Sequence, residues 1–165
     1  CKVISLCEAL EIEKQIFWGD SYYSNVLTPS SCWLIWDKRC ESGIVNTFAD
    51  AELAWTNLSG PTRVHHQLWN GMIRQGESDK RVHPTQKPVA LAEWCFQQYT
   101  SNGETVLDLF GGSGSTMIAS EKLNRKCYMM ELDPQYCDVI VKRFNGLFPE
   151  IEILRNGEAF EPIHE

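Results

Sequence analysis

The sequence lacks long apolar runs, C-x-x-C cysteine pairs and an excess of positive charge, and each absence argues against a class of protein. No apolar run approaches the roughly 20 residues that a helix needs to cross a bilayer, so we expect no membrane partner. The first residues show no basic region followed by an apolar one, which argues against a signal peptide. With 43% hydrophobic and 22% charged residues, the composition is that of a globular domain.

The seven cysteines include no C-x-x-C pair, and no histidine stands at zinc-finger spacing from them. We therefore expect no metal site. An odd number of thiols without a framework pattern indicates a reducing compartment, in which most cysteines act as small buried hydrophobic residues. These features favour a cytoplasmic protein.

The net charge of −7 makes the average surface a poor one for a polyanion. The charge is uneven, because a basic stretch within residues 61–88 contrasts with an acidic one over 145–165. A basic stretch is compatible with nucleic acid, and a solvated loop explains it equally well. The candidate contacts to DNA phosphates are Lys38, Arg39, Arg74, Lys80 and Arg81.

The length of 165 residues suits one ordinary domain and is too short for two well-formed ones. We therefore predict a single domain over residues 1–165. The polar, glycine-bearing segment 71–82 is predicted to be a loop, and it is the best candidate for a ligand-facing insertion.

Apolar runs and turn residues predict the order of helices and strands. The first half is expected to contain a helix over 2–10 and strands over 15–18, 32–36, 51–56 and 64–69. The second half is expected to contain a helix over 89–99, a strand over 105–110, a glycine turn over 111–115, a helix over 116–123, a strand over 126–132 and a helix from 133 to about 144. This β-loop-α-β-α order favours an α/β fold with a mostly parallel sheet and helices on both faces.

The glycine turn 111–115 follows a strand at the edge where parallel sheets bind ligands. Glycines let the backbone approach a ligand closely and direct N–H groups toward it. A phosphate-binding loop is excluded, because Ser115 and Thr116 follow Gly114 in place of a Lys-Ser/Thr pair. A dinucleotide fingerprint is broken at Met117, which leaves a nicotinamide oxidoreductase as an outside alternative.

A nucleoside bound without a pyrophosphate fits the pattern better. Asp108 ends the strand before the turn, and Glu131 ends the next strand, one helix later. A carboxylate at that position can accept two hydrogen bonds from ribose hydroxyls. Each acid taken singly is explained as well by a helix cap or a solvent-facing strand end. The two acids together with the turn predict a nucleoside site.

Three segments resemble the DNA amino-methyltransferases, which methylate the exocyclic amine of adenine or cytosine with S-adenosylmethionine. They are residues 83–88 (HPTQKP), 108–116 (DLFGGSGST) and 131–136 (ELDPQY), with Arg143 one helix later. The order, with the cofactor half C-terminal, looks like the circularly permuted β class. Residues 15–70 are similar to the strand region that precedes this half in phage-type modification methylases.

The resemblance implies a Rossmann-like methyltransferase fold, with residues 1–70 as part of the target-base half and 83–165 as the cofactor half. It implies S-adenosylmethionine as cofactor, double-stranded DNA as partner, and a role in restriction-modification in a bacterium or phage-infected cell. A homodimer would help so small an enzyme to cover its DNA site. The implied cofactor-binding residues are Thr85, Gln86, Lys87, Asp108, Phe110, Gly111, Gly112, Ser113, Gly114, Ser115, Thr116, Glu131 and Asp133.

The family's chemistry depends on a (D/N/S)-P-P-(Y/W/F) motif, whose oxygens accept hydrogen bonds from the target amine and whose ring stacks on the flipped base. The 165 residues do not contain this motif. We expect it upstream of Cys1, and we assign no catalytic residue within the chain. The near match Asp133-Pro134-Gln135-Tyr136 is interpreted as an ordinary helix start.

We therefore predict S-adenosylmethionine-dependent methylation of an exocyclic amine in DNA, and of the two bases we prefer adenine N6. One alternative is a catalytically incomplete cofactor-binding module that needs a missing segment or a partner. Another is a methyltransferase of small molecules or proteins, against which the segment 83–88 argues. The recognition sequence is not readable, because the loop 71–82 is the one visible substitute for a target-recognition domain.

Overall fold

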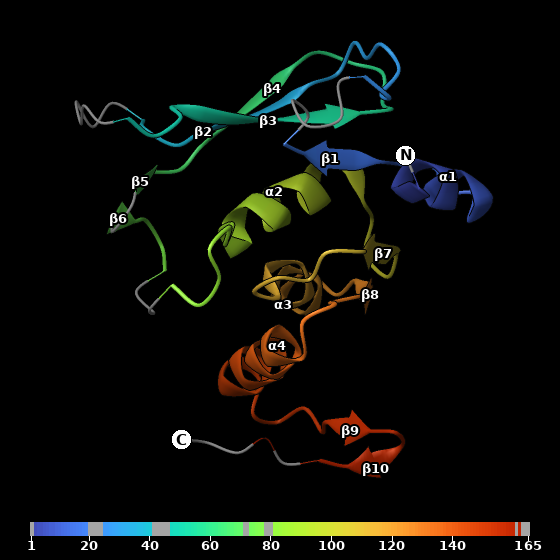
Figure 1. Ribbon diagram of the computed structural model, residues 1–165, viewed down its shortest axis with the longest axis vertical. Helices are drawn as coiled ribbons and strands as arrows, with labels where there is room; N and C mark the ends of the chain where they lie inside the picture. The colour runs from blue at the N-terminus through green and yellow to red at the C-terminus, as the bar shows by residue number, and fades with distance from the viewer. Residues whose placement is uncertain are drawn as a thin grey trace. The chain divides into compact units, whose positions relative to one another are not determined.

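The computed structural model describes residues 2–19, 25–40, 47–70, 73–77, 81–160 and 162. The chain divides into two compact units, residues 1–75 and 76–165 (Figure 1). The boundary falls inside the segment 71–82 that the sequence predicts as a loop. The single domain over residues 1–165 stays a prediction.

The first unit contains a four-stranded sheet in the order β1-β3-β2-β4. Its strands are β1 (Ile16–Trp18), β2 (Leu34–Asp37), β3 (Ala51–Thr56) and β4 (Arg63–His66). β3 pairs antiparallel with both β1 and β2, whereas β2 and β4 are parallel (Figure 1). The four strands predicted in this half are therefore present, and the sheet they form is mixed.

Burial alternates along β2 and shows how this sheet is anchored. Leu34 and Trp36 are fully buried, and the residues that alternate with them are half-buried. The Trp36 ring packs edge-on against Trp69, with ring centroids 6.0 Å apart. Its indole N–H donates a 3.0 Å hydrogen bond to the carbonyl oxygen of Gln67. One face of β2 thus supplies the core of the first unit.

The first unit also contains the helix α1 (Lys2–Ala9) and a short antiparallel ribbon of β5 (Trp69–Asn70) and β6 (Ile73–Arg74). The prediction of one strand over 64–69 is wrong, because β4 ends at His66 and β5 begins at Trp69. The prediction of a loop from residue 71 is wrong at Ile73 and Arg74, which form β6. The Gln67 side chain donates to the carbonyl oxygen of Gln75 at 2.8 Å. The Gln75 side chain accepts the Leu68 N–H at 3.0 Å. These bonds link Gln67 and Leu68 to Gln75.

The second unit is built around a parallel β-α-β unit with further helices. Its elements up to α4 are α2 (Val89–Tyr99), β7 (Thr105–Asp108), α3 (Ser115–Lys122), β8 (Lys126–Met129) and α4 (Pro134–Leu147). β7 and β8 are parallel, with Asp108 beside Met129 in the register, and α3 packs against α2 and β8. The predicted element order is confirmed here. Both strands end earlier than predicted, at Asp108 and Met129. The Asp108 side chain accepts the Phe110 N–H and turns the chain after β7.

The predicted mostly parallel sheet is corrected by the described pairings. The pairs β2–β4 and β7–β8 are parallel, whereas β1–β3, β2–β3 and β5–β6 are antiparallel. A last antiparallel hairpin joins β9 (Leu154–Arg155) to β10 (Glu158–Ala159). Its turn residues Asn156 and Gly157 have φ of 55° and 88°, as a two-residue hairpin turn requires. The α/β class is confirmed, and helices on both faces of one sheet stay a prediction.

Within the described part of the chain, no helix has both the length and the apolar character to cross a bilayer. The histidine, cysteine and acidic side chains of this part form no group of three or more suited to a metal ion.

Candidate ligand pocket

The glycine turn between β7 and α3 is fixed by backbone hydrogen bonds to the end of β8. The Gly111 N–H donates to the Met130 carbonyl, and the Met130 N–H donates to the Asp108 carbonyl, both at 2.8 Å. The Gly114 N–H closes the turn on the Gly111 carbonyl at 2.8 Å. The Asp108 side chain accepts the Phe110 N–H at 2.9 Å, which turns the chain away from the strand. The two strand ends and the turn thus form one framework.

Two glycines of this turn pack closely against neighbouring side chains. A Cβ on Gly111 would lie 2.8 Å from the Met129 sulfur and 3.0 Å from Ile140 Cδ1. Gly114, the N-cap of α3, has φ of 77°, and a Cβ there would lie 3.0 Å from Ile140 Cγ2. The turn backbone therefore packs directly on Met129 of β8 and Ile140 of α4, and a side chain at either glycine would displace them.

Glu131, just beyond β8, ties its own loop to the glycine turn. Its carboxylate accepts the backbone N–H groups of Gly112 at 2.6 Å, Leu132 at 2.8 Å and Asp133 at 3.0 Å. The N–H groups of Asp133 and Gly112 hold the pKa of Glu131 below its ordinary value. The carboxylate is therefore ionised at neutral pH and fixed in direction.

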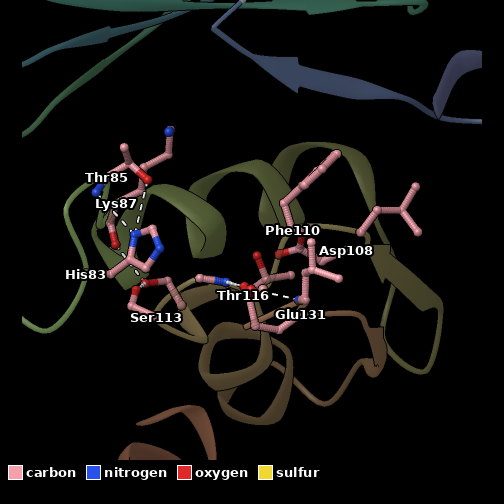
Figure 2. Close-up of a pocket in the computed structure, with 13 residues that line it drawn as sticks. His83, Thr85, Lys87, Asp108, Phe110, Ser113, Thr116 and Glu131 are labelled. Carbon is pink, nitrogen blue, oxygen red and sulfur yellow. Dashed lines mark hydrogen bonds between the residues drawn. The ribbon is translucent and has the colours of Figure 1, made fainter. Parts of the chain in front are cut away.

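A cavity of about 490 Å³ lies over this turn in the second unit (Figure 2). In Figure 2, His83, Thr85 and Lys87 lie on one side of it, and Asp108, Phe110 and Glu131 lie on the other. The cavity is lined by His83, Thr85, Lys87, Asp108, Leu109, Phe110, Gly111, Gly112, Ser113, Ser115, Thr116, Glu131 and Leu132. Carboxylates and basic side chains thus contribute to the same cavity from two parts of the unit.

The cavity also has an apolar rim. Phe110 is 65% exposed and Leu132 is 96% exposed, although both are large hydrophobic residues that line the cavity. Exposed apolar side chains beside a polar cavity mark a surface suited to a flat, partly apolar ligand. The combination suits a molecule with a ring system, hydroxyl groups and charged groups.

Most of the residues predicted to hold the cofactor line this cavity, and three do not. Gln86 is buried, and its side chain donates to Glu77 at 3.0 Å. Gly114 is the N-cap of α3 and does not line the cavity. The Asp133 side chain accepts the Gln135 N–H at 2.9 Å and caps α4. The binding role of every predicted residue stays a prediction.

The prediction that residues 133–136 form a helix start is confirmed. Asp133 is the N-cap of α4, and Pro134 is its first residue. The Tyr136 ring packs against the ring of His83, with centroids 4.2 Å apart. Tyr136 thus packs against a residue of the cavity wall without lining the cavity itself.

Sequence reasoning did not select some residues that shape the cavity. His83 and Leu132 line it but were not chosen, although His83 opens the segment 83–88. The Nδ1 atom of His83 accepts the Thr85 N–H at 3.1 Å, which fixes the start of that segment. Glu77 gave no signal in the sequence, because its partners are remote along the chain.

Two of the candidate DNA contacts are already ion-paired within the first unit. Lys38 Nζ lies 2.9 Å from a carboxylate oxygen of Glu52. Arg39 Nε lies 2.7 Å from a carboxylate oxygen of Asp50. A phosphate would therefore compete with a carboxylate at each position.

The other candidate DNA contacts have different surroundings. The Arg74 guanidinium lies over the Trp69 ring, 5.8 Å from its centroid. Arg81 Nε donates to the carbonyl oxygen of His83 at 3.0 Å. Lys80 lies outside the described residues. The DNA contacts stay predictions.

A DNA methylase family, N6_N4_Mtase, matches residues 31–142. The chain belongs to this family. It is 29% identical over 126 residues to the type II methyltransferase M2.MboI of Moraxella bovis, covering 76% of this chain and 45% of that protein. It is 32% identical over 79 residues to M2.LlaDCHI of Lactococcus lactis subsp. cremoris, covering 47% of this chain and 29% of that protein. The chain thus spans less than half the length of these curated relatives.

Solved structures of DNA methyltransferases share the fold of this chain. The M1.HpyAVI–SAM complex matches with a TM-score of 0.54 at 21% identity, over 80% of this chain and 74% of that one. The cytosine-N4-specific PvuII DNA methyltransferase matches with a TM-score of 0.51 at 15% identity, over 69% of this chain and 50% of that one. These likenesses support the predicted Rossmann-like methyltransferase fold.

Proposed function

We propose that this chain is the cofactor-binding part of an S-adenosylmethionine-dependent DNA amino-methyltransferase. The observation that carries the proposal is the cavity, in which the strand-end acids Asp108 and Glu131 flank a glycine turn and Lys87 adds a cation. Membership of the DNA methylase family supports DNA as the substrate. Because the chain spans less than half of its curated relatives, the activity of the whole protein is part of the proposal.

The cavity fits the chemistry of this cofactor. Its volume of about 490 Å³ is within the usual range for small-molecule sites. Glu131 accepts three backbone N–H groups, and a carboxylate has about four acceptor positions. A ribose hydroxyl would take the remaining position or replace one of the amides. The close packing of Gly111 and Gly114 holds the turn in place for that contact.

The other residues would hold the methionine part of the cofactor. Asp108, Phe110 and Gly112 would form a cradle around it, backed by Gly114. Thr85 and Lys87 would face its carboxylate, because a hydroxyl and an ammonium group suit an anion. Gln86 would support them from the buried side of the segment. When bound, the cofactor supplies a methyl group carried on a positively charged sulfur.

The target amine would be held by residues from outside these 165. The sequence contains no (D/N/S)-P-P-(Y/W/F) motif, and the near match at 133–136 is used to start α4. This observation also favours a second candidate function, a cofactor-binding module that is catalytically incomplete and needs a partner. The two candidates differ in whether the protein itself methylates DNA.

The proposed substrate is double-stranded DNA, with adenine N6 preferred to cytosine N4. Arg74 and Arg81 are the stronger candidates for phosphate contacts, because Lys38 and Arg39 already pair with carboxylates. Lys80 would extend the same basic stretch. A homodimer would extend the contact surface along the duplex.

Expression of the gene that encodes this chain in a host without DNA methylation tests the proposal. Genomic DNA is digested to nucleosides, and the modified bases are identified by mass spectrometry. We expect N6-methyladenine above the empty-vector control. N4-methylcytosine would overturn the preference for adenine. The absence of both would overturn DNA methylation by this protein and leave the cofactor-binding module.

A further inference from the structure

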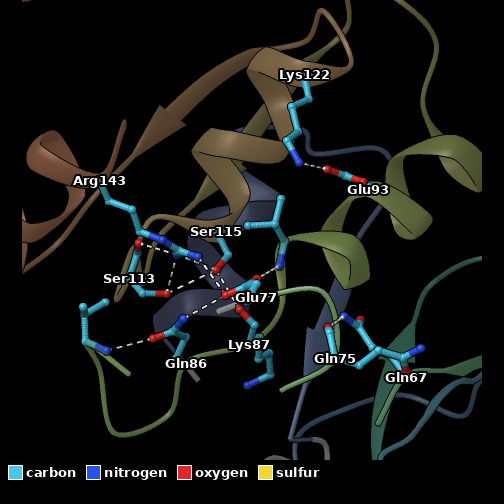
Figure 3. Close-up of polar contacts among 12 residues, drawn as sticks. Gln67, Gln75, Glu77, Gln86, Lys87, Glu93, Ser113, Ser115, Lys122 and Arg143 are labelled. Carbon is cyan, nitrogen blue, oxygen red and sulfur yellow. Dashed lines mark hydrogen bonds and ion pairs between the residues drawn. The ribbon is translucent and has the colours of Figure 1, made fainter. Parts of the chain in front are cut away.

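We propose that the ion pair between Glu77 and Arg143 is a positioning device for the cofactor cavity. Arg143 Nη2 donates to Glu77 Oε2 at 2.9 Å, and the two side chains are 13% and 11% exposed for Glu77 and Arg143, respectively (Figure 3). Both residues lie in the second unit, and neither lines the cavity. The inference rests on the proposed function, since it assigns these residues a role in holding the cofactor site.

Glu77 fixes the segment that carries Thr85 and Lys87. Its Oε1 atom accepts the N–H of Val89 at 2.7 Å, at the first residue of α2. The N-cap residue Pro88 makes no side-chain capping bond, so Glu77 caps this helix from 12 residues away. Its Oε2 atom accepts the side-chain N–H of Gln86 at 3.0 Å. A single carboxylate therefore holds both ends of the segment 86–89.

Arg143 fixes the glycine turn at Ser113 and Ser115. Its Nη1 atom donates to the Ser113 carbonyl at 3.0 Å, and it lies 3.3 Å from the Ser113 hydroxyl and 3.2 Å from the Ser115 hydroxyl. The Ser115 hydroxyl donates to the Lys87 carbonyl at 2.7 Å. Figure 3 shows the guanidinium reaching both serines and Glu77. The pair thus joins the turn to the segment that carries Lys87.

A general contribution to stability does not explain this arrangement. Taking two charges out of water is costly, and apolar residues of similar volume often stabilise a fold as well or better. Apolar residues cannot hold backbone groups in fixed directions, whereas this pair binds the Val89 N–H and the Ser113 carbonyl. A lysine could replace the charge of Arg143 but not its planar fork of donors. What the ion pair does, and apolar residues could not do, is hold Ser113, Ser115 and Lys87 in place.

The test compares cofactor affinity with stability in the 165-residue chain. Arg143→Lys keeps a cation opposite Glu77 and removes the fork, so we expect affinity for S-adenosylmethionine to fall about tenfold. The midpoint of thermal unfolding of Arg143→Lys should fall much less than that of Arg143→Gln, which breaks the ion pair. The double variant Glu77→Gln/Arg143→Gln removes both buried charges, and it should recover stability relative to Arg143→Gln without recovering affinity. Affinity that follows stability in every variant would overturn the proposal.

A matched control is available in the same unit. Glu93 and Lys122 form a 2.9 Å ion pair outside the cavity. It joins α2 to α3, so the double variant Glu93→Gln/Lys122→Gln also removes a link between helices. We expect its affinity for S-adenosylmethionine to match that of the wild type. A loss as large as that of Arg143→Lys would overturn a specific role for the Glu77–Arg143 pair.

Hydrogen exchange without ligand separates this inference from the proposed function. In Arg143→Lys, we expect faster amide exchange over residues 111–116 and at Val89, with unchanged exchange in the first unit. Unchanged exchange over 111–116 would overturn the positioning role, whatever the chain binds. A wild-type chain that does not bind S-adenosylmethionine would overturn the proposed function, and the exchange result would then decide the positioning role alone.

Discussion

The Glu131 carboxylate accepts a 2.6 Å hydrogen bond from the backbone N–H of Gly112, 19 residues earlier in the chain. This bond ties the end of β8 to the glycine turn that follows β7. The side chain proposed to hold the ribose therefore also shapes the turn proposed to cradle the methionine. A change at Glu131 should act on both parts of the cofactor site.

Replacing Glu131 with alanine should weaken binding of S-adenosylmethionine by roughly 1.5–3 kcal/mol, the usual effect of losing a hydrogen bond to a charged group. Isothermal titration calorimetry on the chain measures the change. Glu121→Ala is the matched control, because Glu121 is an exposed glutamate on α3 that does not line the cavity. Equal affinities for Glu131→Ala and the wild type would remove Glu131 from the site.

Stability should fall at acid pH in a way that depends on Glu131. Its folded-state pKa is lowered by the N–H groups of Asp133 and Gly112, so its contribution is complete above the ordinary pKa of about 4.5. The contribution is lost as the pH falls through the lower, folded-state pKa. Urea unfolding at pH 7 and pH 3 should therefore show a smaller loss for Glu131→Gln than for the wild type. Equal losses would contradict the assigned hydrogen bonds.

The two glycines Gly111 and Gly146 should respond to alanine in opposite directions. A Cβ on Gly111 would lie 2.8 Å from the Met129 sulfur, so Gly111→Ala should destabilise the chain by roughly 1–3 kcal/mol. A Cβ on Gly146, within α4, meets nothing within 4 Å, so Gly146→Ala should stabilise by roughly 0.5–1 kcal/mol. Urea unfolding measures both. A neutral Gly111→Ala would show that the turn is not closely packed on Met129.

Tyr136→Ala should lower affinity for the cofactor, because the Tyr136 ring supports His83 in the cavity wall. We expect about 0.5–1.5 kcal/mol, the usual contribution of an aromatic pair. Tyr128→Ala is the control, since Tyr128 is 66% exposed on β8 and does not line the cavity. Unchanged affinity together with a loss of methyl transfer would instead make Tyr136 a target-base residue.

The β-α-β unit could be predicted from the sequence because its signals are local. Apolar runs mark β7 and β8, and the glycine turn 111–115 and the pair Asp133-Pro134 mark the turns between elements. The acids at the two strand ends then meet at one edge, since β7 and β8 are parallel. The same local signals do not give strand order, so the mixed pairing of the first sheet was not predicted.

Contacts between residues that lie far apart in the chain could not be predicted from the sequence either. Glu77 meets Arg143 across 66 positions, and neither residue carries a local signal of that contact. Asp37 likewise accepts the Nδ1 hydrogen of His66 at 2.9 Å, because β2 and β4 pair in parallel at those residues. Burial raises the pKa of Asp37, but hydrogen bonds from His66, Cys40 and Arg39 lower it below its ordinary value. Such pairs follow from the tertiary fold.

Calorimetric titration of the 165-residue chain with S-adenosylmethionine, and with NADH as a control, tests the central claim most directly. The paired acids and the broken dinucleotide fingerprint predict saturable binding of S-adenosylmethionine at one site and no binding of NADH. Binding of NADH alone, or of neither compound, would contradict the claim that this cavity is a site for S-adenosylmethionine.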